Sequence, residues 1–265
     1  MNDWRRYDTV AETYEKVRAP VTAAVAADLV ALAAPEAGAR ILDVGSGTGV
    51  AADAAAAAVP AGLVVGADLS VEMLRVGTRA RPGLRLVGAE AIQLPFRDAA
   101  FDAVLANFVL TEFTRWDTAL FDLIRVLRPG GTLAASVWRT EEDELSRTWR
   151  ALVERTVGQE MLRSAIREAT PWAERFGDAT RFEDTLRQSG LRPVRVEKRT
   201  YRFAMTREEY IEEQATRALG RFVRGMLGES GWSSFLDQAQ DAYASGFGEN
   251  VEDSRDVLLA VGTKP

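Results

Sequence analysis

Short apolar runs alternate with helical patterns through the first half of the chain. Runs rich in aliphatic and β-branched residues predict strands: ARILDV (39–44), LVVGAD (63–68), LRLVGA (84–89), DAVLANFVL (102–110) and TLAASVW (132–138). Helical stretches separate most of these runs, and parallel strands need such crossover connections. The alternation therefore predicts an α/β fold with a doubly wound, mostly parallel sheet.

The second half of the chain is dominated by helical patterns. Two further strand-like runs, PVRVEKRTYRF (193–203) and VLLAVGTKP (257–265), bring the expected sheet to seven strands. The helical segments 141–179 and 206–252 lie beside these late strands. In a doubly wound sheet this position is near the crevice at the carboxyl ends of the strands, so we expect a helical lid there.

Helix-start signals occur three times in this second half. Thr170 is followed by a proline and predicts the start of a helix. Thr180 with Glu183, and Thr206 with Glu209, have the spacing of a capping box, in which each side chain bonds the other residue's backbone N–H. The second box predicts one long helix after residue 206.

Aromatic and basic side chains are frequent in the helical segments. We interpret the aromatic residues as internal packing, with an apolar substrate pocket as the alternative: Trp149, Trp172, Phe176, Phe222, Trp232 and Phe235. We interpret the arginines as a solvated face balanced by glutamates, with an acidic substrate as the alternative: Arg147, Arg150, Arg163, Arg167, Arg217, Arg221 and Arg224.

Composition narrows the possible functions. A formal charge of −6 opposes binding to a phosphate backbone, so no nucleic-acid partner is expected. The chain has no cysteine and no histidine, which excludes disulfides and thiolate zinc sites and removes the commonest general base, so no metal site is expected. The alanine-rich run VTAAVAADLVALAAP is too short to span a bilayer and contains Asp28. We therefore expect a cytoplasmic protein without a membrane partner.

A glycine-rich loop follows the first predicted strand. In ILDVGSGTG the strand ends at Asp43 and Val44, and the chain turns through Gly45, Gly47 and Gly49 into a helix. Without Cβ atoms a ligand can approach the backbone closely and meet free N–H groups at the helix start. Dinucleotides, phosphates and other nucleosides all use this design.

The spacing of the loop discriminates among these ligands. The dinucleotide fingerprint G-x-G-x-x-G requires a glycine where the chain has Val50, and no Gly-Lys-Ser or Gly-Lys-Thr follows for a P-loop. Asp68 ends the second predicted strand, about 20 residues after the glycines, where an acidic side chain can hold the hydroxyls of a ribose. The pattern favours a nucleoside ligand.

The successive motifs resemble those of a known family. ILDVGSGTG, GADLS, AEAIQLPF leading to FDAVLANFVL, and VLRPGGTLAAS are similar to the motifs of class I S-adenosylmethionine-dependent methyltransferases. The nearest branch includes the ubiquinone and menaquinone C-methyltransferases and many small-molecule methyltransferases of bacterial secondary metabolism. The resemblance is dense over about residues 1–140. It implies a Rossmann-like methyltransferase fold and S-adenosylmethionine as the cofactor.

The resemblance also implies roles for individual residues. The first motif would hold the amino-acid part of the cofactor, Asp68 would hold its ribose, and an N-terminal helix would lay tyrosines over its carboxylate. The implied cofactor-binding residues are Tyr7, Tyr14, Asp43, Gly45, Ser46, Gly47, Gly49, Asp68, Leu69, Met73, Glu90, Ala91 and Asn107. Glu90 departs from the family, which usually has an aspartate at the adenine amino group.

Methyl transfer from a sulfonium centre does not require an acid or a base. In-line placement of a nucleophile, with water excluded, can contribute roughly 7 to 11 kcal/mol of barrier reduction. Thr111 and Glu112 occupy positions where this branch often has paired histidines. If a base is used, Glu112, Tyr14 or Asp117 are the candidates, and we take Glu112 and Tyr14 as the catalytic candidates.

The expected organisation is one methyltransferase domain over residues 1–265. We expect N-terminal helices over 1–35 to cover the cofactor, and a core at about 36–140, 180–205 and 255–265. The acceptor would be a small molecule or a modified peptide, methylated on oxygen, nitrogen or carbon, by a monomer or a homodimer. Two alternatives stay open: an S-adenosylmethionine-binding protein that transfers no methyl group, such as a rearrangement catalyst or binding module, and an NAD-dependent oxidoreductase.

Overall fold

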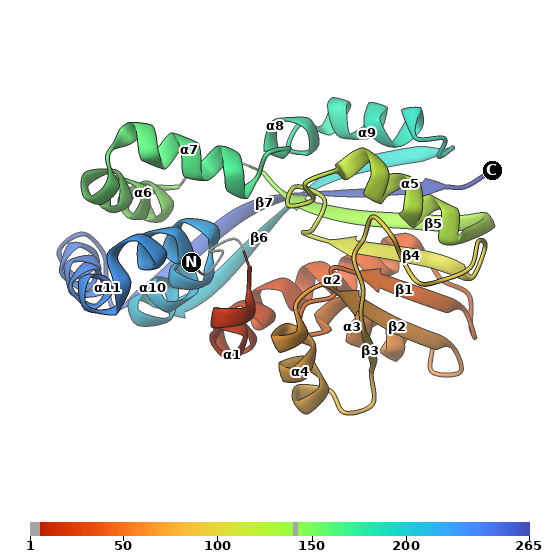
Figure 1. Cartoon of the computed structure of the whole chain (residues 1–265), viewed down its shortest axis with the longest axis horizontal. Helices are drawn as coiled ribbons and strands as arrows, with labels where there is room; N and C mark the ends of the chain where they lie inside the picture. Colours follow the sequence, from red (N-terminus) through yellow and green to blue (C-terminus); the bar gives the residue numbers. More distant parts are fainter. Residues whose placement is uncertain (1–5, 140–142) are drawn as a thin grey trace.

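Seven strands form a single sheet in the structure, a computed structural model that describes residues 6–139 and 143–265 (Figure 1). The strands are β1 (Arg40–Val44), β2 (Leu63–Asp68), β3 (Arg85–Gly88), β4 (Phe101–Asn107), β5 (Leu127–Trp138), β6 (Val194–Thr206) and β7 (Asn250–Thr263). Residues 1–5 of the expected N-terminal cover, residue 140 of the expected core, and residues 141 and 142 of the expected lid lie outside the described ranges.

The sheet has the order β3-β2-β1-β4-β5-β7-β6. The five strands from β3 to β5 pair in parallel, while β7 runs antiparallel to both β5 and β6. This confirms the predicted doubly wound, mostly parallel seven-stranded Rossmann-like sheet. The order reverses between β1 and β4, and the crevice at such a switch point is the usual ligand site of these sheets.

Helices and short helical turns connect the strands. They are η1 (Asp8–Val10), α1 (Ala11–Thr13), η2 (Tyr14–Arg18), α2 (Ala19–Ala33), α3 (Val50–Ala58), α4 (Val71–Ala80), α5 (Trp116–Val126), α6 (Glu144–Val157), α7 (Gln159–Ala169), α8 (Ala173–Phe176), α9 (Ala179–Gln188), α10 (Arg207–Thr216) and α11 (Ala218–Gly246). Helices α2 and α3 pack on one face of the sheet, through a core that includes Leu29 and Ala52. Helices α5, α8 and α9 pack on the other face, through Leu123, Phe176 and Phe182.

A second hydrophobic core lies within the late helices. Trp149 of α6, Tyr210 of α10 and Phe235 of α11 are buried together with residues of α7. Figure 1 shows α6, α7, α10 and α11 grouped at one end of the sheet, beside the outer parts of β6 and β7. Helix α8 lies instead within the segment expected to be lid, yet its Phe176 belongs to the core of the sheet.

Strands β6 and β7 form an antiparallel pair that extends beyond the rest of the sheet. Their pairing runs from Val194 opposite Gly262 to Thr206 opposite Asn250. Strand β5 pairs with β7 only as far as Trp138. Helices α10 and α11 are therefore inserted at the tip of a two-stranded arm.

Several sequence expectations about element boundaries need correction. The strand expected over 102–110 ends at Asn107, because the chain turns at the next residue. Thr170 ends α7 instead of starting a helix, and only the four-residue α8 follows. Asp178, not Thr180, caps α9 by accepting the backbone N–H of Arg181.

The second capping box is confirmed. The Thr206 side chain accepts the N–H of Glu209, and the Glu209 carboxylate accepts the N–H of Thr206. The helix that it starts is shorter than expected, because Arg217 has an extended conformation that separates α10 from α11. A further break occurs at Gly228, which has φ 66° and ψ 177° within α11.

Two structural features are absent from the described ranges. No helix in them has both the length and the apolar character that a bilayer crossing requires. They also contain no group of three or more acidic side chains arranged to hold a metal ion.

Candidate active site

The glycine-rich loop between β1 and α3 has a conformation that depends on glycine. Gly45, Gly47 and Gly49 have φ values of 68°, 56° and 93°, in the left-handed region that side chains disfavour. A Cβ atom on Gly45 would lie 2.4 Å from Cγ2 of Val109, and one on Gly47 would lie 3.1 Å from Cε of Met73. Both glycines line a cavity, so the loop presents bare backbone to it.

The amide groups of this loop are already engaged within the protein. The N–H groups of Gly45 and Ser46 donate to the carbonyl of Ala67, at 2.8 and 3.1 Å. The N–H of Gly47 donates to Oδ2 of Asp68 at 2.7 Å. These three N–H groups are therefore satisfied within the protein, and what this part of the loop offers a ligand is room for close approach.

Asp68 ends β2 at the edge of the same cavity. Its Oδ1 accepts the N–H of Ser70 at 2.8 Å, while Oδ2 accepts the N–H of Gly47. Burial raises the pKa of Asp68, and the two amides oppose that change by stabilising the charged form. The carboxylate is thus held by two backbone amides, and the residue lines the cavity.

Asp43 lies behind the loop and does not line the cavity. Its side chain is fully buried, with Oδ2 accepting the N–H of Ala52 at 3.0 Å. Among the described residues Oδ1 has no hydrogen-bond partner. Burial raises the pKa of Asp43 to about 8, and the negative charge of Asp68 adds to the increase. We therefore expect Asp43 to hold a proton at neutral pH, and its bond to Ala52 fixes α3 to the end of β1.

Tyrosines of the N-terminal segment cover the cavity. The rings of Tyr7 and Tyr14 meet edge to face, with 5.7 Å between their centres. The Tyr7 hydroxyl donates to Oε1 of Glu112 at 2.8 Å. Burial raises the pKa of both phenols, so they stay protonated and act as donors. Of the two catalytic candidates, Glu112 therefore fits the role of a base better than Tyr14.

Glu112 lies in the turn between β4 and α5, four residues before the helix starts at Trp116. Its exposed surface faces the cavity. Loss of contact with water raises the pKa of the Glu112 carboxyl. The charges of Arg221 and Arg18 and the hydrogen bond from Tyr7 oppose this increase in part. A carboxylate with a raised pKa is a better proton acceptor than an ordinary surface glutamate.

The end of β4 forms another wall of the cavity. Asn107 Oδ1 accepts a hydrogen bond from the hydroxyl of Ser136 at 2.6 Å, which fixes the amide. Phe108 follows with φ 61°, a strained value for a residue with a side chain. Its ring stacks on Trp138 at 3.9 Å between centres and is nearly parallel to it, at 4°.

These groups enclose a cavity of about 360 Å³, a size within the usual range of small-molecule sites. It brings together most of the predicted site residues: Tyr7, Tyr14, Gly45, Gly47, Asp68, Leu69, Met73, Glu90, Ala91, Asn107 and Glu112. Asp43, Ser46 and Gly49 belong to the predicted set but do not line it. Glu168, Ala169, Pro171 and Arg221 reach the cavity from the late helices and the turn after α7.

The aromatic residues of the late helices are absent from the cavity wall. Trp149, Phe176, Trp232 and Phe235 are buried in the hydrophobic cores, in agreement with the packing interpretation. The aromatic side chains that do line the cavity come from the core of the domain, for example Phe108 and Phe113.

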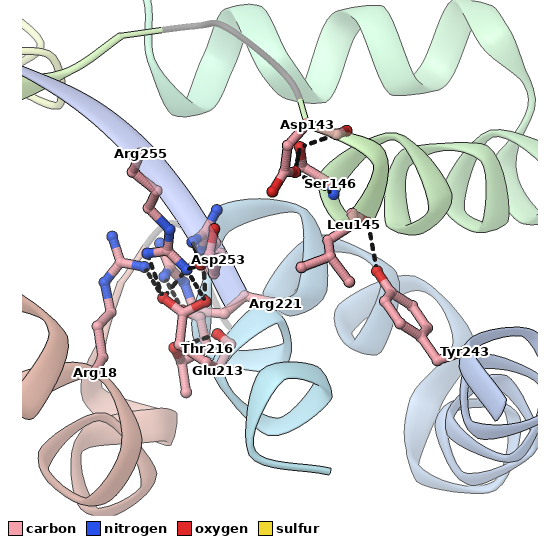
Figure 2. A network of polar contacts seen from close by, with 11 residues as sticks. Arg18, Asp143, Leu145, Ser146, Glu213, Thr216, Arg221, Tyr243, Asp253 and Arg255 are labelled. Carbon is pink, nitrogen blue, oxygen red and sulfur yellow. Dashed lines mark hydrogen bonds and ion pairs between the residues drawn. The ribbon is translucent and has the colours of Figure 1, made fainter. Parts of the chain in front are cut away.

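A buried ion-pair network lies beside the cavity (Figure 2). Glu213 of α10 is fully buried and accepts from Arg18 at 2.7 Å, from Arg217 at 2.9 Å and from Arg255 at 3.1 Å. Arg255 also contacts Asp253 on β7. These arginines hold the pKa of Glu213 well below its usual range, despite its burial. The network joins the N-terminal cover to α10 and to the β6–β7 arm.

Arg18 is a functional candidate that sequence reasoning missed, and Arg221 is one that it gave only as an alternative. Both are buried and both line the cavity. The Arg221 guanidinium lies 3.8 Å from the centre of the Tyr7 ring, and its Nη1 donates to the carbonyl of Thr216 at 2.5 Å. Interpreting Arg221 as part of a solvated face was therefore wrong. A usable signal was its place in a mainly apolar helical stretch, LGRFVRGML.

The fold and the cavity define a Rossmann-like domain with a nucleoside-sized site at the carboxyl ends of its central strands. This class follows from three features: the shape of the glycine loop, the fixed carboxylate of Asp68, and the tyrosines Tyr7 and Tyr14 on the cavity wall.

Comparison with known proteins identifies the domain more closely. Residues 42–135 match the family model described as a methyltransferase domain. A demethylmenaquinone methyltransferase of Renibacterium salmoninarum is 42% identical over 100 residues, which are 37% of this chain and 41% of that protein. A malonyl-[acyl-carrier protein] O-methyltransferase of Methylococcus capsulatus is 32% identical over 168 residues, 62% of this chain and 56% of that protein. The matches thus span about half or less of these relatives.

The fold is shared with solved structures at low identity. A Haemonchus contortus phosphoethanolamine N-methyltransferase 2 superposes with a TM-score of 0.58 at 17% identity, over 100% of this chain and 61% of that one. Residues 42–135 thus carry a methyltransferase domain, and the chain is similar to class I S-adenosylmethionine-dependent methyltransferases of the ubiquinone and menaquinone branch.

The residues of the cavity fit the cofactor of this class. Asp68 presents a carboxylate where ribose hydroxyls need an acceptor. Leu69, next to it, is 61% exposed although it is a large apolar side chain, and a bound adenine would cover such a surface. Gly45 and Gly47 leave space against the backbone for the methionine portion.

Proposed function

We propose that this protein transfers the methyl group of S-adenosylmethionine to a nucleophilic acceptor that binds in the cavity. The observation that carries the proposal is the position of Asp68, fixed by two backbone amides next to the bare loop at Gly45 and Gly47. An oxidoreductase is disfavoured because Val50 replaces the third glycine of the dinucleotide fingerprint.

The binding roles follow from the geometry. Asp68 would accept hydrogen bonds from the ribose, and Leu69 and Met73 would pack against the adenine. Glu90 and Ala91, on the loop after β3, would contact the edge of the adenine ring. Asn107, held by Ser136, would face the methionine portion, together with Arg18 and Tyr14.

When bound, the cofactor supplies an electrophilic methyl group on a sulfonium sulfur. The chain would contribute position and exclusion of water, with Tyr7, Tyr14 and Arg221 packed together on the cavity wall. Such positioning can supply roughly 7 to 11 kcal/mol of barrier reduction without an acid or a base. Glu112 is the group placed to accept a proton from an acceptor that has one to lose.

Further parts of the proposal concern the late helices and the acceptor. We assign α6, α7, α10 and α11 the role of a lid, because Glu168 and Arg221 reach the cavity from them. The acceptor is a small molecule or a modified peptide.

Calorimetry tests the cofactor site directly. S-adenosylmethionine is titrated into the wild type, into Asp68→Asn and into Glu72→Gln, a control on an exposed glutamate of α4 that pairs with Arg75. The wild type and the control should bind equally. Asp68→Asn should bind at least about tenfold more weakly, since a hydrogen bond to a charged group contributes about 1.5 to 3 kcal/mol.

The comparison ligand is NAD, which should produce no binding signal. Undiminished affinity of Asp68→Asn, or tighter binding of NAD than of S-adenosylmethionine, would contradict the proposal. Incubation with acceptors and detection of S-adenosylhomocysteine then separates methyl transfer from binding alone.

A further inference from the structure

Two carboxylates on the cavity wall have no role in the proposed binding of the methyl donor, S-adenosylmethionine. Glu112 accepts the hydroxyl of Tyr7, and Glu168 accepts the hydroxyl of Ser164 at 3.2 Å. Within residues 6–139 and 143–265, neither carboxylate forms an ion pair. Glu112 comes from the turn after β4 and Glu168 from the end of α7, so they approach the cavity from the core and from the late helices.

The arginines on the same wall are engaged elsewhere. Arg6 and Arg18 each contact a carboxylate outside the cavity wall, at 2.9 and 2.7 Å. The guanidinium of Arg221 stacks on Tyr7 and donates to a backbone carbonyl, and its charge offsets that of Glu112 only in part. Counted formally, the wall carries four carboxylates against three guanidinium groups, so it stays negative: Asp68, Glu90, Glu112 and Glu168 against Arg6, Arg18 and Arg221. A cleft with low-dielectric walls strengthens the effect of such a charge on a charged ligand.

We propose that the methyl acceptor is an amine, which enters the cavity as an ammonium ion attracted by Glu112 and Glu168. This inference rests on the proposed methyl transfer and names the substrate class of that site. An anionic acceptor would be repelled by both carboxylates, and a neutral alcohol would gain nothing from them. Phe108, Val109 and Phe113 on the wall fit an amine attached to an apolar or aromatic group.

The chemical step balances without a further reactant. Glu112 accepts a proton from the ammonium ion, which leaves a neutral nitrogen with a lone pair. That lone pair forms the new nitrogen–carbon bond as the methyl–sulfur bond breaks, and the sulfur keeps the electron pair of the broken bond. The positive charge passes from sulfur to the methylated nitrogen, and the product leaves as a methylammonium ion.

Binding of three isosteric probes tests the inference. 2-Phenylethylamine, 2-phenylethanol and 3-phenylpropanoate are titrated at pH 7 into protein saturated with S-adenosylhomocysteine. The amine, which is protonated at this pH, should bind at least tenfold more tightly than the alcohol, and the carboxylate should bind most weakly. Equal affinities, a preference for the alcohol or the carboxylate, or no detectable binding of the amine at millimolar concentration would overturn the inference.

Variants of the two glutamates test whether their carboxylates cause the preference for the amine over the alcohol. Glu112→Gln keeps an acceptor for Tyr7, and Glu168→Gln keeps one for Ser164, so both should fold normally. Each should reduce the preference for the amine over the alcohol at least threefold. Glu160→Gln, on the same helix as Glu168 but away from the cavity, should leave the preference unchanged.

The same titrations separate this inference from the proposed function. If S-adenosylhomocysteine itself does not bind, the proposed function fails. If S-adenosylhomocysteine binds and the amine is not preferred, only the assignment of an amine acceptor fails. A preference that survives both glutamine substitutions would also overturn the inference, since the two carboxylates are its physical basis.

Discussion

The hydroxyl of Tyr7 donates a 2.8 Å hydrogen bond to the carboxylate of Glu112, across 105 residues of sequence. The bond joins the N-terminal segment to the turn after β4, and both residues line the cavity. Arg221 stacks on the other side of Tyr7, which brings a residue of α11 to the same place. Three distant segments of the chain thus meet over the proposed methyl-transfer site.

We expect Tyr7→Phe to raise the pKa of Glu112. The hydrogen bond from Tyr7 stabilises the charged carboxylate and lowers its pKa, so removing the hydroxyl should move the titration to higher pH. The measurement is a ¹³C NMR titration of the Glu112 carboxyl, assigned by its absence in Glu112→Gln. Tyr201→Phe, which removes a comparable 2.6 Å bond to Asp28 outside the cavity, should not move it. An unchanged or lower pKa in Tyr7→Phe would contradict the expectation, since the hydrogen bond would then not stabilise the charged carboxylate.

We expect Asp43→Asn to flatten the dependence of stability on pH. The pKa of Asp43 is raised from 3.8 to about 8, so between these values the folded protein holds a proton that the unfolded chain has lost. Stability from this group is therefore complete below about pH 4 and falls as the pH rises toward 8, by up to about 1.4 kcal/mol per pH unit. Asparagine is neutral at every pH and should remove this contribution.

Urea unfolding of the ligand-free protein at pH 5 and pH 8 checks this expectation. The wild type should lose more free energy of unfolding between the two pH values than Asp43→Asn. Asp68 and Glu112, whose pKa values are also raised, contribute in the same direction in both proteins and cancel in the comparison. An equal loss in the two proteins would mean that Asp43 is ionised when buried.

We expect Gly45→Ala to impair cofactor binding much more than Gly83→Ala. Gly45 has φ 68°, and an added Cβ would lie 2.4 Å from Val109. Gly83 has no left-handed φ, and a Cβ there would meet nothing within 4 Å. The strain should cost about 1 to 3 kcal/mol. Thermal unfolding and calorimetry with S-adenosylmethionine measure the two effects, and equal behaviour of the two variants would contradict the requirement for glycine.

We expect Glu213→Gln to destabilise the protein by about 3 to 5 kcal/mol. The substitution leaves Arg18, Arg217 and Arg255 without the buried carboxylate that they share, and removing one partner of a buried ion pair is costly. The neighbouring Glu212, which pairs with Lys16 at the surface, supplies the control Glu212→Gln, for which little change is expected. Urea unfolding compares them, and similar stabilities would show that the network is dispensable.

The parts of the fold that are local in sequence were accessible to prediction. Each of the first five strands is a short aliphatic run with its own turn signal, so the parallel half of the sheet and its glycine loop follow from patterns of a few residues. Asp68 was predicted for the same reason, since it ends a strand whose position relative to the loop is set by the βαβ unit. The two remaining strands were also predicted. Strand β7, however, starts at Asn250, seven residues before its apolar run, because its first residues are defined by pairing with β6 and not by an apolar pattern.

The parts that were missed depend on contacts between distant segments. Arg18 and Glu213 are 195 residues apart, and nothing in either local pattern distinguishes them from exposed charges. Arg221 was taken as solvated because arginine usually is, whereas here a stacked tyrosine and a backbone carbonyl compensate its burial. The strained φ of Phe108 is likewise imposed by tertiary contacts with Ser136 and Trp138, which no short pattern encodes.

The pairing of Thr206 with Asn250 has an evolutionary implication. The chain leaves the sheet at one residue of this pair and returns to it at the other, so the intervening segment can be exchanged without changing the strand order, provided that a carboxylate equivalent to Glu213 keeps its pairing with Arg18 and Arg255. Recombination at this residue pair would change the acceptor molecule that the enzyme methylates, while the sheet and the cofactor site are kept. Chimeras joined there are a natural starting point for engineering new selectivity.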